Sequence, residues 1–237
     1  PRLNAAGRLD SAVAALNLLL AKDVGEAAVL AQQLDIQNRE RQEITRNIQA
    51  HAEETAITKD ADALLLFAAD ESYNPGVIGL VAARIAEKYF RPSIVAHQGS
   101  ELTRGSCRSI PEFHITHALD RCADLLVRYG GHSAAAGFTV RNENLPGLIE
   151  RLTSIASEEL SHIDLQPSIF VDAEVSLSEL TPEVSESLTY LEPTGAGNPQ
   201  ATFISHGVKV LRSRAVGRDK SHLKLTVTDG FITYDAI

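Results

Sequence analysis

The segment Gly105–Ser109 (GSCRS) carries residue types that bind phosphate groups. Arg108 offers a planar fork of N–H donors that fits phosphate oxygens, and the hydroxyls of Ser106 and Ser109 add further donors. Gly105 adds a flexible backbone position next to them. The segment therefore predicts a phosphate site at the end of a strand. A strand-end turn with a surface arginine is the structural alternative.

A second candidate is the segment Gly130–Gly137 (GGHSAAAG). Gly130 and Gly131 would allow close approach of a ligand, and His132 follows them directly. Histidine can donate to a phosphate oxygen or act as a general acid or base. Equally, the two glycines could end a helix and His132 could be a structural residue, so both interpretations stay open on these residues alone.

Two further segments carry unusual arginine or lysine content. Arg2 and Arg8 in PRLNAAGRLD precede a helix and could form an anion site there. A strongly basic stretch near the C-terminus could face nucleic-acid phosphates or could be a solvated hairpin. Its basic residues are Lys209, Arg212, Arg214, Arg218, Lys220 and Lys224.

Other patterns predict less. His114 and His117 have the spacing of a metal-chelating pair, but the sequence offers no evident third ligand, and capping or surface roles fit them better. Arg108 next to Cys107 is an arrangement that can lower a thiol pKa, although nothing in the sequence supplies a base. Gly195 and Gly197 lack the following helix that a dinucleotide-binding loop needs.

The elements that would position these residues divide the chain into three regions. Residues 1–10 predict a loop, residues 11–21 a helix and residues 23–57 one long helix, with Asp23 and Glu26 as a capping box. Within a central α/β domain we expect strands at 63–68, 93–96, 102–107 and 135–140, and helices at 77–90, 115–129 and 145–160. The first two strands should be a parallel pair, and Gly130 and Gly131 should end the helix 115–129.

The remainder predicts a small, incomplete β-barrel. Strands are expected at 168–175, 202–211, 223–227 and 231–237, with a helix at 182–191 and a turn-rich loop at 194–199.

Composition favours a globular protein. The chain has 237 residues, a net charge of -9, 44% hydrophobic residues and 22% charged residues. No apolar stretch approaches the roughly 18 residues of a transmembrane helix, and no signal peptide is evident. Two cysteines do not make a disulfide framework, so a reducing, cytoplasmic compartment is expected. Because the chain starts at Pro1 and contains no Met, we expect it to be part of a longer protein.

Together, PRLNAAGRLD, GSCRSIPEFHI and GGHSAAAGF resemble, in this order, the bacterial RecJ exonucleases of the DHH phosphoesterase family. The stretch SYNPGVIGLVAARIAEKYFRPSIV resembles the start of the family's DHHA1 domain. EPTGAGNPQ is similar to the loop leading into its OB-fold, except that the family more often has an aromatic residue in place of Thr194.

The resemblance implies a DHHA1 domain, with a mixed sheet and flanking helices, preceded by a long connecting helix and followed by a partial OB-fold barrel. The expected boundaries are 1–57, 58–162 and 163–237. It implies the substrate-binding part of a 5′→3′ exonuclease for single-stranded DNA in repair and recombination. Two Mn²⁺ or Mg²⁺ ions would be held by DHH motifs that this chain lacks, so no catalytic or metal-binding residue is expected in it.

The resemblance also implies roles for individual residues. Arg8, Ser106, Arg108 and Ser109 would bind the 5′ phosphate, and the segment Gly130–His132 would face the active site. The basic residues from Lys209 to Lys224 would hold the strand. The implied partners are single-stranded DNA with a 5′ end and a single-strand-binding protein or helicase, with no membrane.

Two alternatives remain. A DHH-type phosphodiesterase for short oligoribonucleotides or cyclic dinucleotides shares the Gly-Gly-His segment but usually lacks a trailing OB-fold. A non-catalytic DHH relative that only binds nucleic acid would differ in residues outside this chain.

Overall fold

The computed structural model describes residues 2–59, 62–217 and 220–237, and the chain divides into the units Pro1–Pro167 and Ser168–Ile237. The first unit begins with three helices: α1 (Arg2–Leu9), α2 (Val13–Leu20) and α3 (Val24–Lys59). The long helix is confirmed, but the loop expected at 1–10 is wrong. Residues 2–9 are helical because Ala5 and Ala6 pack as buried, strongly helix-forming residues, with Ala6 in a cluster with Leu34 of α3.

A mixed five-stranded sheet follows, in the order β1-β2-β3-β5-β4. The strands are β1 (Leu66–Asp70), β2 (Ser93–Gln98), β3 (Leu102–Arg108), β4 (Leu126–His132) and β5 (Ala135–Arg141). The pair β1–β2 is parallel and is joined by helix α4 (Ile78–Tyr89), as predicted, whereas the other pairs are antiparallel.

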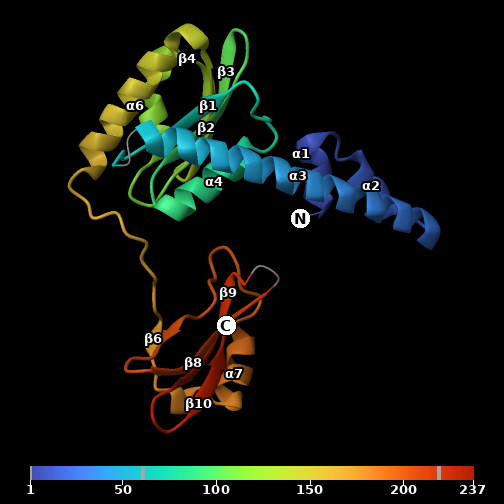
Figure 1. Cartoon of the computed structure of the whole chain (residues 1–237), viewed down its shortest axis with the longest axis vertical. Coiled ribbons are helices and arrows are strands. Elements are labelled where there is room, and N and C mark those ends of the chain that lie inside the picture. The colour runs from blue at the N-terminus through green and yellow to red at the C-terminus, as the bar shows by residue number, and fades with distance from the viewer. Residues whose placement is uncertain (1, 60–61, 218–219) are drawn as a thin grey trace. The chain divides into compact units, whose positions relative to one another are not determined.

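Helices cover the two faces of this sheet unequally (Figure 1). Helices α3 and α4 pack on the face that carries Leu66 and Val95, with α3 against β1 and α4 against β2 and β3. Helices α5 (Ile115–Asp120) and α6 (Leu145–Leu160) pack on the opposite face, against Cys107 and Phe138. Residues 127–132 of β4 are not covered, since none of them is buried.

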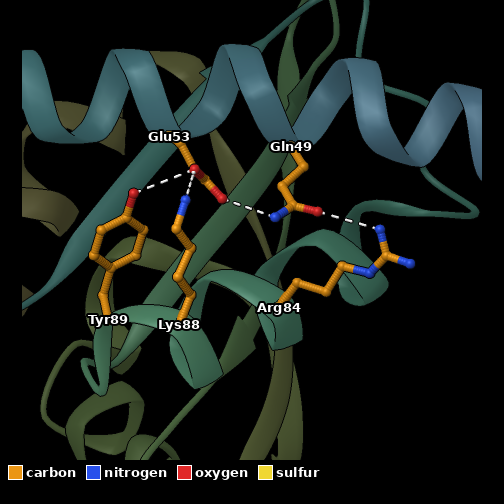
Figure 2. Close-up of polar contacts among 5 residues, drawn as sticks. All are labelled: Gln49, Glu53, Arg84, Lys88 and Tyr89. Carbon is orange, nitrogen blue, oxygen red and sulfur yellow. Dashed lines mark hydrogen bonds and ion pairs between the residues drawn. The ribbon is translucent and has the colours of Figure 1, made fainter. Parts of the chain in front are cut away.

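A polar network joins α3 to α4 (Figure 2). The Glu53 carboxylate accepts hydrogen bonds from Gln49, Lys88 and Tyr89, and Arg84 donates to Gln49. Partial burial alone would raise the pKa of Glu53, but the bonds from Lys88 and Gln49 outweigh it and the pKa is lowered. The long helix is thereby fixed on α4.

The helix expected at 115–129 is confirmed only as far as residue 120 and is wrong beyond it. Helix α5 ends at Asp120, a 3-10 turn occupies Ala123–Leu125, and β4 begins at Leu126. Gly130 and Gly131 therefore do not end a helix but pair with β5 inside a strand. A Cβ atom at Gly131 would lie 2.3 Å from the Ala135 carbonyl oxygen, so the close approach of the two strands requires glycine there.

The second unit contains an antiparallel sheet in the order β10-β9-β8. These strands are β8 (Lys209–Val216), β9 (His222–Thr228) and β10 (Thr233–Ala236). The strand expected at 168–175 shrinks to β6 (Ala173–Glu174), which pairs in parallel with β7 (Phe203–Ile204). The strand expected at 202–211 is interrupted because Gly207 adopts a left-handed backbone, with φ of 68°.

The remaining elements are short. Helix α7 spans Pro182–Leu188 and is capped by the Thr181 side chain, and 3-10 turns occupy Asn142–Asn144, Leu177–Glu179 and Thr189–Leu191. The sheet of this unit does not close on itself, so the unit is a partial barrel. Within the described ranges, no helix combines the length and apolar character needed to cross a membrane.

Candidate nucleic-acid interface

Ser106 and Arg108 occupy alternate positions of β3 and both reach the first turn of α4. A Cβ atom at Gly79 of that turn would lie 2.9 Å from Ser106 Oγ and 3.1 Å from Arg108 Nη2. Arg108 Nη1 donates to Ser106 Oγ at 3.3 Å and to the Cys107 carbonyl at 2.7 Å. A hydroxyl and a guanidinium therefore converge at one helix N-terminus.

The backbone at this N-terminus adds donors. The Asn74 carbonyl accepts the N–H groups of Val77 and Ile78, but the Gly79 N–H has no hydrogen-bond acceptor among the described residues. The partial positive charge of a helix N-terminus stabilises anions. Together with Ser106 and Arg108, the first turn of α4 therefore has the donors and charge that a phosphate group needs.

The loop before α4 is held firmly by its neighbours. Tyr73 is 1% exposed, and its hydroxyl lies 2.9 Å from Nδ1 of His51 on α3. Burial raises the Tyr73 pKa to about 12. Arg8 Nη1, on α1, donates to the Gly76 carbonyl oxygen at 3.5 Å. This contact holds the exposed Arg8 side chain against the same loop.

The other predicted site residues lie on or beside the same strands. His132 pairs with Ala135, which pairs in turn with Arg108, so His132 lies in the same row of the sheet and is exposed. Gly130 and Gly131 precede it in β4. The Ser109 hydroxyl, by contrast, donates to the Phe113 carbonyl at 2.6 Å and so holds the loop after β3.

Sequence reasoning missed several residues of this region. Gly79 could have been suggested by the Asn-Pro-Gly turn directly before a helix. Arg8 and Arg84 both lie near Arg41, although the three arginines are far apart in the sequence. Burial, followed by the charges of Arg8 and Arg84, lowers the pKa of Arg41. Arg41 Nε is buried without a hydrogen-bond partner among the described residues.

The basic residues of the second unit gather on β8 and β9. Arg212 pairs with Thr226 and Arg214 with Lys224, and Lys209 stands at the start of β8. An open pocket of about 520 Å³ is lined by Arg212, Ser213, Arg214, Lys224, Thr226 and Asp235.

The basic residues of this stretch differ in whether their side chains are free to contact a DNA strand. Lys224 Nζ forms an ion pair with Asp235 at 2.8 Å. Lys220 is exposed in the turn between the strands, with φ of 53°. Arg218 lies outside the described residues.

Metal ligands do not assemble in the part of the chain that the structure describes: no three His, Cys, Asp or Glu side chains form a group that could hold an ion. His114 and His117 stack with ring centroids 3.5 Å apart, and His114 caps α5 by accepting the His117 N–H. The donor set needed for a pair of Mn²⁺ or Mg²⁺ ions is thus not offered by these residues.

The idea of a lowered thiol pKa at Cys107 is wrong. Cys107 is buried in the core between β3 and the helices α5 and α6, and burial raises its pKa to about 12 despite the nearby Arg108 charge. Its side chain points to the face opposite Ser106 and Arg108.

Comparison with known proteins places these features in a family. The DHHA1 domain family matches residues 61–158, and the RecJ OB domain family matches residues 171–237. The single-stranded-DNA-specific exonuclease RecJ of Bacillus subtilis is 34% identical over 100% of this chain and 30% of its own length. The RecJ of Escherichia coli is 35% identical over 96% of this chain and 40% of its own length.

Solved structures agree with this. The crystal structure of RecJ in complex with Mn²⁺ from Thermus thermophilus is 32% identical, with a TM-score of 0.83, and covers 100% of this chain and 34% of that chain. The chain therefore spans less than half of the length of these relatives. With a DHHA1 domain and a RecJ OB domain in this order, it belongs to the RecJ family and corresponds to the C-terminal part of its relatives.

Proposed function

We propose that this chain is the substrate-holding part of a 5′→3′ exonuclease for single-stranded DNA that acts in repair and recombination. The observation that carries the proposal is the convergence of Ser106, Arg108 and the free Gly79 N–H at the N-terminus of α4. The relatives' name, single-stranded-DNA-specific exonuclease, supports the substrate class.

In this proposal the 5′-terminal phosphate sits at the first turn of α4. Arg108 forms charge-assisted hydrogen bonds to it, and Ser106 and Gly79 donate to the remaining oxygens. Arg8 approaches from the loop side, through Gly76. A terminal phosphate carries more negative charge than an internal phosphodiester, so this arrangement favours strand ends.

The second unit would hold the strand without reading its sequence. Arg212 and Arg214 present charge along β8, and few aromatic residues (5%) are available for stacking. Binding should therefore depend steeply on salt concentration.

Divalent Mn²⁺ or Mg²⁺, bound by residues outside this chain, would supply the activated water that hydrolyses the phosphodiester. Two structural relatives contain these ions. The residues described here would position the strand end for that reaction. The proposal includes a cytoplasmic location and a single-strand-binding protein or helicase as partner. The RecJ OB domain favours this proposal over a dinucleotide phosphodiesterase.

The proposal is tested by digesting 5′-labelled single-stranded DNA in the presence of Mn²⁺. The full-length protein should release labelled mononucleotide, whereas this chain alone should bind the strand without cutting it. A full-length protein that cleaves dinucleotides in preference to long strands would contradict the proposal and support the phosphodiesterase. A full-length protein that binds the strand but cannot cut it would support the non-catalytic alternative.

A further inference from the structure

A continuous row of polar residues lies two positions along the sheet from Ser106. Arg104 of β3 pairs with Thr139 of β5, and Thr139 pairs with Arg128 of β4. Because side chains alternate between the faces of a sheet, Arg104 faces the same side as Ser106 and Arg108. The row is therefore displaced by about 7 Å along β3 from the Ser106 hydroxyl.

The neighbouring row, which contains Ser106, carries no side chain on β5 and β4, because Ser106 pairs with Gly137 and Gly137 pairs with Gly130. An open pocket of about 320 Å³ is bordered by Arg104, Arg128 and Thr139, with Gly130 and Gly137 in its floor. A Cβ atom at Gly130 would meet nothing within 4 Å, and one at Gly137 would meet only the Gly105 carbonyl oxygen at 3.5 Å. A ligand can thus lie directly on the backbone here.

The two arginines are available to a ligand. Arg104 is exposed and makes no side-chain hydrogen bond or ion pair with any described residue. Arg128 is exposed and donates only its Nε, to Thr139 Oγ1 at 3.2 Å, so its two terminal nitrogens are directed to no partner among those residues. No acidic side chain borders the pocket in the described part of the chain.

We propose that Arg104 and Arg128 form a second phosphate-binding site, which holds an internal phosphate of the strand whose 5′ end is bound at α4. The inference rests on the proposed function and extends it to a second subsite. The strand would leave the first turn of α4, cross the glycine floor and place a following phosphate between the two guanidinium groups. Arginine forks suit phosphate oxygens, and the open space over Gly137 and Gly130 leaves room for a sugar.

The experiment measures equilibrium binding to this 237-residue chain. The ligands are a 5′-phosphorylated mononucleotide and a 5′-phosphorylated oligothymidylate of about six nucleotides, both labelled at the 3′ side. The variants are the double substitution Arg104→Ala/Arg128→Ala and, separately, Gly130→Leu, which fills the pocket from a position where a Cβ atom has open space. Arg46→Ala, on the exposed surface of α3, controls for the loss of a positive charge away from the pocket.

The double variant should bind the oligomer about tenfold more weakly, as expected for lost charged hydrogen bonds. The slope of log affinity against log salt should shrink by about 1.4. Gly130→Leu should weaken oligomer binding too. Binding of the mononucleotide should stay unchanged in the double variant, and Arg46→Ala should behave as the parent chain with both ligands.

Two results would overturn the second site. Unchanged oligomer affinity and salt slope in the double variant would mean that Arg104 and Arg128 contact no phosphate of the strand. Equal losses for mononucleotide and oligomer would place them at the terminal phosphate instead. Failure of the proposed function is distinguishable, because it would appear in the unsubstituted chain as equal affinity for phosphorylated and unphosphorylated ends.

Discussion

Gly79 and Ser106 meet where α4 crosses β3, and a Cβ atom at residue 79 would lie 2.9 Å from the Ser106 hydroxyl oxygen. The same Cβ atom would lie 3.1 Å from Arg108 Nη2. Glycine at this position therefore allows the hydroxyl and the guanidinium to approach the N-terminal turn of a helix. The approach brings three kinds of phosphate donor, a backbone N–H, a hydroxyl and an arginine, into one place.

Gly79→Ala should weaken binding of a 5′-phosphorylated strand severalfold while leaving the fold intact. The new methyl group displaces Ser106 and Arg108, but alanine also gains about 0.5–1 kcal/mol over glycine in a helix. Thermal unfolding should therefore change little. Gly147→Ala on α6 is the control, because a Cβ atom there would meet nothing within 4 Å. A Gly79→Ala chain with parental affinity would show that the turn does not contact the phosphate.

The two cysteines should be inert in the folded protein. Cys107 and Cys122 are both buried, and burial raises the pKa of each thiol, that of Cys107 to about 12. A colorimetric thiol reagent at mildly alkaline pH should therefore react only after denaturant is added. Rapid reaction of the native chain would contradict the placement of Cys107 in the core.

The contact between α3 and α4 should weaken in acid. The pKa of Glu53 is lowered in the folded state from its usual value of 4.5. The stabilisation is therefore fully present above that value and is lost as the pH falls through the lower folded pKa. Glu53→Gln should reduce the free energy of unfolding at neutral pH by roughly 1 kcal/mol and flatten its dependence on pH below 4.5.

Urea unfolding at a series of pH values measures this effect. The exposed Glu43 of the same helix supplies the control, since Glu43→Gln should keep the parental pH dependence. If Glu53→Gln also kept it, the network of Figure 2 would not be formed by an ionised carboxylate.

Arg212→Ala/Arg214→Ala should lower affinity for single-stranded DNA and reduce the salt slope by about 1.4. Both residues border the pocket on β8 and β9, and neither forms an ion pair with a described residue. Anisotropy titrations over a range of salt concentrations provide the slope. The preference for a 5′ phosphate should stay unchanged, and an unaltered slope would remove this sheet from the DNA-binding surface.

Local patterns in the sequence were sufficient for much of the fold. The apolar run around Leu66 and the helical spacing of Val77, Val81 and Ile85 predicted the parallel pair and α4. The Gly-Gly pair misled because its glycines serve a close approach between β4 and β5, which depends on residues distant in the sequence. Likewise, residues 2–9 are helical through packing on α3.

The candidate site likewise combines residues that local sequence patterns reveal and residues that only the fold brings together. Ser106 and Arg108 stand out because they alternate along one strand and follow a glycine. Arg104, Arg128 and Gly79 could not be grouped from sequence, because sheet register and the crossing of α4 over β3 bring them together.

The most direct test of the account compares 5′-phosphorylated and 5′-hydroxyl strands of identical sequence in competition for this chain. The parent should prefer the phosphorylated strand by about tenfold or more, and Arg108→Ala should abolish that preference while Arg46→Ala keeps it. Equal affinity of the parent for both strands, or an unchanged preference in Arg108→Ala, would contradict a terminal-phosphate site at the N-terminus of α4.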